Sequence, residues 1–175
     1  MRSLAILLLV VAVATAALPG QQPGPPYPVD STRADTARPA PPTPAQERYL
    51  WGLRTASRGI AQLKNGVNRV ARAQALKDSL QLRQAGQRLA GLCVAARGFL
   101  TSGRGDMAPA AYEPPTRASA KDLAQRIDSL AAYSVTCEHA AGKTPAPVTV
   151  GLLARIRTYE GALAAFRTAV GLPNR

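Results

Sequence analysis

The sequence predicts an all-α protein built as a four-helix bundle, and two observations support this fold class. Four segments carry apolar residues alternately three and four positions apart, which is the pattern of a helix packed against other helices. Proline, glycine and capping residues mark the breaks between these segments. The bundle is predicted to occupy residues 45–175, which is long enough for one domain with a hydrophobic core.

The residues predicted to be buried form four runs, one for each helix. The first run is Tyr49, Leu53, Ala56, Ile60, Leu63, Val67 and Val70. The second is Leu82, Ala85, Leu89, Leu92, Ala96 and Phe99. The third is Ala120, Leu123, Ile127, Leu130, Ser134, Cys137 and Ala141. The fourth is Leu152, Ile156, Tyr159, Leu163, Phe166 and Val170.

The expected helix starts follow from local chemistry. Thr43 is predicted to cap the first helix, with Pro44 at its first position and Gln46 completing a capping box. The third helix is expected to open at 114–116, with Thr116 or Ser119 as its N-cap. The sequence 144–145, a threonine followed by a proline, opens the fourth helix.

The boundary between the first two helices is less sharply marked. The apolar pattern changes phase between Val70 and Leu82, where Asp78 is a candidate cap. Asn65-Gly66 is a competing turn. The later break is preferred because it gives four helices of similar length, about 24 residues or about 36 Å each.

Residues 1–17 have the pattern of a cleavable signal peptide, which predicts a secreted or periplasmic protein. A short basic start precedes an apolar run that ends in small residues. An uncleaved membrane anchor is the alternative, although the run is short for a span. Residues 18–44 are rich in proline and are predicted to form a disordered tether, with a docked polyproline ligand as the alternative.

Five glycines inside the predicted helices require a reason, because glycine destabilises a helix interior. Gly52, Gly59 and Gly66 are seven residues apart, as are Gly91 and Gly98, which predicts close approach of two helix backbones. A shallow ligand groove is the alternative for these glycines.

The chain contains two cysteines, Cys93 and Cys137. An even count in an exported protein favours a disulfide, with two buried free thiols as the alternative. A flush antiparallel hairpin of the second and third helices, with a loop at about 102–116, would separate the two residues by about 18 Å. We therefore expect either staggered antiparallel helices or parallel helices joined by a crossover.

The chain is strongly basic, with 22 Lys and Arg against 10 Asp and Glu. Such a charge attracts polyanions or anionic membrane surfaces, although arginines can also simply solvate helix faces. Residues 48–77 contain seven basic residues and no acid. Arg54, Arg58, Arg69 and Arg72 fall with Asn65 within an arc of about 60°.

Trp51 lies on the same side of the predicted first helix. A tryptophan beside arginines can stack on a base or a sugar, or lie at a membrane interface. We therefore predict a binding face for an anionic partner at Trp51, Arg54, Arg58, Arg69 and Arg72. The alternative is that Trp51 packs against a neighbouring helix or the tether.

The sequence lacks the residue patterns of an enzyme or a cofactor protein. His139 is the only histidine, and no motif for phosphate binding or nucleophilic catalysis occurs. We expect no metal, no cofactor and no catalysis. No specific nucleic-acid motif is present, a protein partner remains open, and the oligomeric state is not determined.

The function expected from these observations is that of an exported, non-enzymatic interaction module. One alternative is an extracytoplasmic sensor or carrier with a small-molecule pocket around Tyr133, Ser134 or Tyr159. The other is a structural or stress-related protein of the cell envelope.

Overall fold

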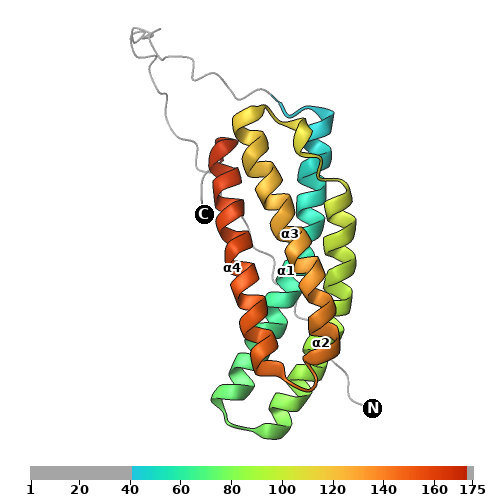
Figure 1. Cartoon of the computed structure of the whole chain (residues 1–175), viewed down its shortest axis with the longest axis vertical. Helices are drawn as coiled ribbons and strands as arrows, with labels where there is room; N and C mark the ends of the chain where they lie inside the picture. The colour runs from blue at the N-terminus through green and yellow to red at the C-terminus, as the bar shows by residue number, and fades with distance from the viewer. Residues whose placement is uncertain (1–40, 173–175) are drawn as a thin grey trace, which may run out of the picture. The chain divides into compact units, whose positions relative to one another are not determined.

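The computed structural model describes residues 41–172, which form four α-helices and one short 3-10 helix without any strand. Their bounds are α1 Pro44–Ala75, α2 Ser79–Gly105, η1 Pro109–Ala111, α3 Pro114–Ala140 and α4 Pro145–Ala169. Successive helices run in opposite directions, and α4 closes the bundle against α1 (Figure 1). The predicted helical bundle is therefore confirmed. The predicted signal peptide at 1–17 and tether residues 18–40 lie outside the described residues.

The first two helices start where the sequence predicts. The Thr43 hydroxyl accepts a hydrogen bond from the Gln46 backbone at 3.3 Å, and the Gln46 side chain accepts from the Thr43 backbone at 2.9 Å. Asp78 caps α2 by accepting from the backbones of Leu80 and Gln81, each at 2.9 Å. The later of the two predicted breaks is correct, and Asn65-Gly66 lies within α1.

Two details of the helix ends differ from the prediction. Glu113 is the N-cap of α3, in place of Thr116 or Ser119, because the prolines after it fit the first turn, where no intrahelical N–H bond is lost. α1 has 32 residues and is longer than expected, while α2 and α3 each have 27 and α4 has 25. Thr144 is the N-cap of α4, as predicted, but its side chain makes no capping hydrogen bond.

All residues predicted to be buried on α1 and α3 are buried, including Ser134, whose hydroxyl donates to the Leu130 carbonyl at 2.8 Å. The prediction for α2 is wrong at three positions. Leu82, Leu92 and Phe99 are only half-buried, whereas Cys93 and Leu100 are fully buried. α2 packs against both α1 and α3, so its buried stripe points between these two neighbours and not along a single seam.

The glycines of α1 bring its backbone into contact with α2. A Cβ atom at Gly59 would lie 2.8 Å from the Ala96 carbonyl oxygen. A Cβ atom at Gly52 would overlap the Gly103 carbonyl oxygen, and one at Gly103 would overlap that of Gly52. Gly66 adjoins α2 in the same way, since its Cβ would lie 2.7 Å from a Leu89 methyl carbon. The predicted close approach of helix backbones is therefore confirmed for α1.

The corresponding prediction for Gly91 and Gly98 is wrong. A Cβ atom at either position would have no heavy atom within 4 Å, because both glycines lie on the exposed side of α2. The glycines of α2 that allow close packing are Gly103, against α1, and Gly86, against the carbonyl of Ala141.

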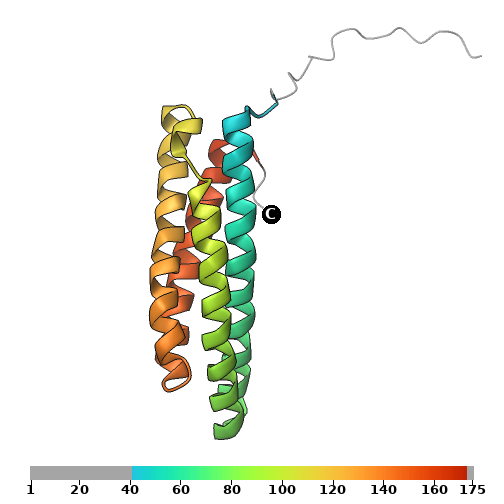
Figure 2. The ribbon, with the colours of Figure 1, turned by 90° about the vertical axis from the view of Figure 1, so that its right-hand side faces the viewer.

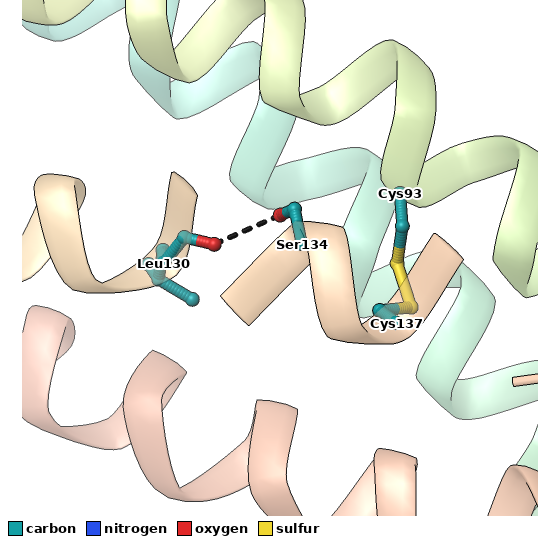
Figure 3. The surroundings of a disulfide bond; sticks show 4 residues. All are labelled: Cys93, Leu130, Ser134 and Cys137. Atoms are coloured by element: carbon teal, nitrogen blue, oxygen red, sulfur yellow. Dashed lines mark hydrogen bonds between the residues drawn. A yellow bond between two sulfur atoms is a disulfide. The ribbon is translucent and has the colours of Figure 1, made fainter. Parts of the chain in front are cut away.

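The structure joins Cys93 and Cys137 in a disulfide, as predicted, with their Cα atoms 6.0 Å apart (Figure 3). Both cysteines are fully buried. The helices that carry them are antiparallel and staggered (Figure 2), so the parallel crossover is wrong. The connection runs from 106 to 113, which is shorter than the expected loop at 102–116.

The stagger follows from the positions of the cysteines. Cys93 is about 18 Å from the end of α2, whereas Cys137 is about 35 Å from the start of α3. The first turns of α3 must therefore extend about 17 Å beyond the end of α2. Figure 2 shows this overhang, and it shows the loop between α1 and α2 extending past the loop between α3 and α4 at the other end.

The segment after α2 fills the space that the overhang leaves. Met107 and Tyr112 are buried there, and η1 contacts both α1 and α3. The Tyr112 ring lies 5.1 Å from that of Tyr49 on α1 and 5.3 Å from that of Phe166 on α4. The Tyr49 hydroxyl donates to the Ala120 carbonyl of α3 at 2.8 Å, so this aromatic cluster ties three helices together.

We expect Leu89→Ala and Ile127→Ala each to lower the free energy of unfolding by about 2–5 kcal/mol, because both side chains are fully buried. Arg58→Ala should change it by less than about 0.5 kcal/mol, because Arg58 is exposed. Urea denaturation of the three variants measures these changes. Equal losses for the leucine and arginine variants would contradict the assignment of the core.

We expect Gly59→Ala and Gly98→Ala to have opposite effects. The new methyl group at residue 59 presses on the Ala96 carbonyl, which belongs to the backbone and cannot move aside, so stability should fall by about 1–3 kcal/mol. At residue 98 the methyl group meets open space, and the higher helix propensity of alanine should add about 0.5–1 kcal/mol. Thermal melts of the two variants provide the comparison, and changes of the same sign would argue against a specific contact at Gly59.

Candidate functional site on the outer face of α1

The structure places the predicted anionic-partner residues on the outer face of α1. Arg54, Arg58, Arg69 and Arg72 are all exposed, as is Asn65 between them. The glycines that touch α2 and the apolar residues of the core occupy the other sides of the helix. From Arg54 to Arg72 the row extends about 27 Å along the helix. We call these four side chains the arginine row.

No member of the arginine row forms an ion pair with an acid of residues 41–172. The ion pairs among these residues are Lys64–Glu160, Arg97–Glu138, Arg104–Asp128 and Arg126–Asp122, and none includes a member of the row. Arg69 donates to the Asn65 side-chain oxygen at 3.3 Å, which orients the guanidinium without cancelling its charge. The row is therefore free to bind external anions.

Trp51 is 57% exposed, so its side chain is not buried against a neighbouring helix. It borders a shallow groove together with Arg48, Arg54 and Asp106. Pro42 and Pro44, which belong to the part of the predicted tether that the structure describes, line the same groove. The indole thus presents an open aromatic face at the N-terminal end of the arginine row.

A second groove, between α1 and α4, was not expected from the sequence. It has a volume of about 560 Å³, and its apolar lining includes Leu53, Leu163 and Phe166. Arg54 and Arg58 line it from α1, and Arg167 lines it from α4. We call it the α1–α4 groove.

The packing of α1 explains why this groove exists. The glycine contacts hold α1 tightly against α2, and α1 touches α4 over a much shorter length. Leu163, which the apolar pattern predicts to be buried, is half-buried because it forms the wall of the groove, and Ala162 is buried in its place. Val170 is also half-buried, and it lines an adjoining groove with Leu50 and Leu172.

The sequence also suggests a small-molecule pocket around Tyr133, Ser134 or Tyr159. None of these residues lines either groove. Ser134 is fully buried and bonded within α3 (Figure 3). The Tyr133 ring stacks against the Arg155 guanidinium at 3.9 Å, and the Tyr159 hydroxyl lies 3.2 Å from the Ser57 hydroxyl. Tyr133 and Tyr159 therefore join neighbouring helices, whereas the Ser134 hydroxyl is bonded within α3.

Two further searches of the described residues bear on the site. Within residues 41–172, no group of three or more His, Cys, Asp or Glu side chains is arranged to hold a metal ion. In the same range, none of the helices combines the length and the apolar character that crossing a bilayer requires.

Comparison with models of protein families, with curated proteins and with solved structures finds no match to this chain.

Burial raises the pKa of three tyrosines of the bundle, Tyr49, Tyr112 and Tyr159. The pKa of Tyr49 is raised by burial and further by the neighbouring Tyr112. Burial also raises the pKa of Tyr112. Burial raises the pKa of Tyr159 as well, and its hydrogen bond to Ser57 partly offsets this. The folded protein therefore holds these phenolic protons more tightly than the unfolded chain does.

We expect the contribution of these buried tyrosines to the free energy of unfolding to be lost at alkaline pH. Unfolded tyrosines titrate near pH 10, so the contribution of a raised pKa is full below about pH 10 and falls as the pH rises toward the folded-state value. Tyr49→Phe should cost about 0.5–1.5 kcal/mol at pH 8, because the hydrogen bond to Ala120 is lost. The deficit should shrink by pH 11. Urea denaturation at both pH values tests this, and parallel losses in the parent and variant would contradict it.

Proposed function

We propose that this protein is an exported, non-enzymatic binding module whose arginine row holds an anionic polymer. The observation that carries the proposal is the set of four exposed arginines on one helix face, none paired with an acid among residues 41–172. Arginine binds phosphate, sulfate and carboxylate groups through two parallel hydrogen bonds. A row about 27 Å long presents several such donors to one extended chain.

The charge distribution along α1 supports an external partner over simple solvation of the helix. Exposed helices usually mix both signs, because Glu and Lys four residues apart stabilise each other. The stretch 48–77 has no acid, so no ion pair within this stretch offsets the repulsion between its arginines. Trp51 adds an exposed aromatic face beside Arg54, which suits stacking on a sugar ring or a base of the polymer.

Export is the second part of the proposal and rests on residues 1–17 and on the disulfide. Disulfides persist mainly in oxidising compartments outside the cytoplasm. A buried Cys93–Cys137 bond agrees with that environment but does not by itself require it. Fractionation of cells that express the full chain, followed by mass measurement of the N-terminus, tests both export and cleavage.

We expect the protein to bind heparin resin, a sulfated polymer, and to elute at a salt concentration that reports the arginine row. Arg58→Glu with Arg69→Glu should lower that concentration markedly, because two of the four binding charges are reversed. Arg83→Glu with Arg88→Glu is the matched control, since these exposed arginines lie on α2 and the change of net charge is identical.

The control variant should elute much closer to the parent protein. Equal shifts in the two double variants would contradict the proposal, because they would show that retention follows net charge and not the arginine row. Circular dichroism melts of both variants establish that each remains folded.

A further inference from the structure

We infer that the α1–α4 groove binds a free single-chain amphiphile with an anionic head group, such as a fatty acid. The inference rests on the proposed function in one respect, because Arg54 and Arg58 belong to both surfaces. It adds a second ligand class and a residue outside the arginine row, Arg167 of α4.

The floor of the groove suits an apolar chain. Leu50, Leu53, Leu163 and Phe166 contribute to its lining from the two helices, and Ala61 leaves space at one end because its side chain is small. Its volume of about 560 Å³ lies within the range of small-molecule sites. Burying an alkyl chain there stabilises the complex by about 0.8 kcal/mol for each buried CH₂ group.

The rim of the groove suits an anion. Arg54, Arg58 and Arg167 all line it, and none of the three forms an ion pair with an acid of the described residues. Ser57 also lines it, and its hydroxyl donates to the Leu53 carbonyl. Three cations beside an apolar surface attract a head group with negative charge, and they repel a cationic amphiphile.

The shape of this surface favours a free amphiphile over a membrane. A helix that inserts into a bilayer presents a convex apolar face to the lipid. The outer face of α1 instead carries Asn65 and the arginine row, and its apolar surface is recessed between α1 and α4. A single acyl chain can lie in that recess while its head group remains at the arginine rim.

Isothermal titration of the full protein with sodium laurate, kept below its micelle concentration, tests the inference. We expect one binding site per chain. Dodecyl maltoside, which is uncharged, and dodecyltrimethylammonium, which is cationic, have an alkyl chain that is longer by one CH₂ group, and they should nevertheless bind at least about tenfold more weakly.

Two groove variants and one control separate the parts of the site. Ala61→Phe fills the groove from an exposed position and should abolish laurate binding. Arg58→Gln with Arg167→Gln should weaken it about tenfold or more. Arg69→Gln with Arg72→Gln is the matched control, because it removes two unpaired arginines of the same row that do not line the groove. Laurate affinity should be unchanged in this control, while heparin elution falls.

Several results would overturn the inference. Equal affinity for laurate and the two dodecyl probes would do so, as would laurate binding that survives Ala61→Phe. Binding to vesicles of anionic phospholipid without binding to laurate would also overturn it. A ligand-free dimer that Ala61→Phe dissociates would assign the groove to a second copy of the chain. Failure of the proposed function is distinct, since it appears as unchanged heparin elution in the Arg69 and Arg72 variant.

Discussion

The direct contact between the backbones of α1 and α2 is the constraint on which the other features depend. Gly52 and Gly103 lie against each other's carbonyl groups, and Gly59 lies against Ala96. A side chain at these positions would force the helices apart, since the atoms in contact belong to the backbone. The contact sets how far α1 can reach toward α4, and it turns the arginine row away from the core.

The disulfide and the aromatic cluster address a second problem, which is the register of α3 against α2. The Cys93–Cys137 bond requires α3 to overhang α2, and the overhang leaves one end of the bundle without a fourth helix. Tyr112 fills that space and packs against Tyr49 and Phe166. A covalent constraint and a packed aromatic cluster thus stabilise the same staggered arrangement from two places in the chain.

Both candidate binding surfaces arise from this asymmetry. Tight packing of α1 on one side leaves space on the other, where α1 and α4 separate into a groove. The same helix has a row of arginines that form no ion pair with an acid of the described residues. A polymer along the row and an amphiphile in the groove would share Arg54 and Arg58, so the two ligands are expected to compete.

The sequence alone determined the four helices, the cap at Asp78 and the pairing of Cys93 with Cys137, because helical periodicity, capping and cysteine count are local or nearly local properties. Only the tertiary structure decided which side of α2 is buried and how far α3 slides along it, because both depend on two neighbouring helices at once. It also placed Arg58 and Arg167 in the lining of one groove. These residues are more than one hundred positions apart, and no spacing in the chain relates them.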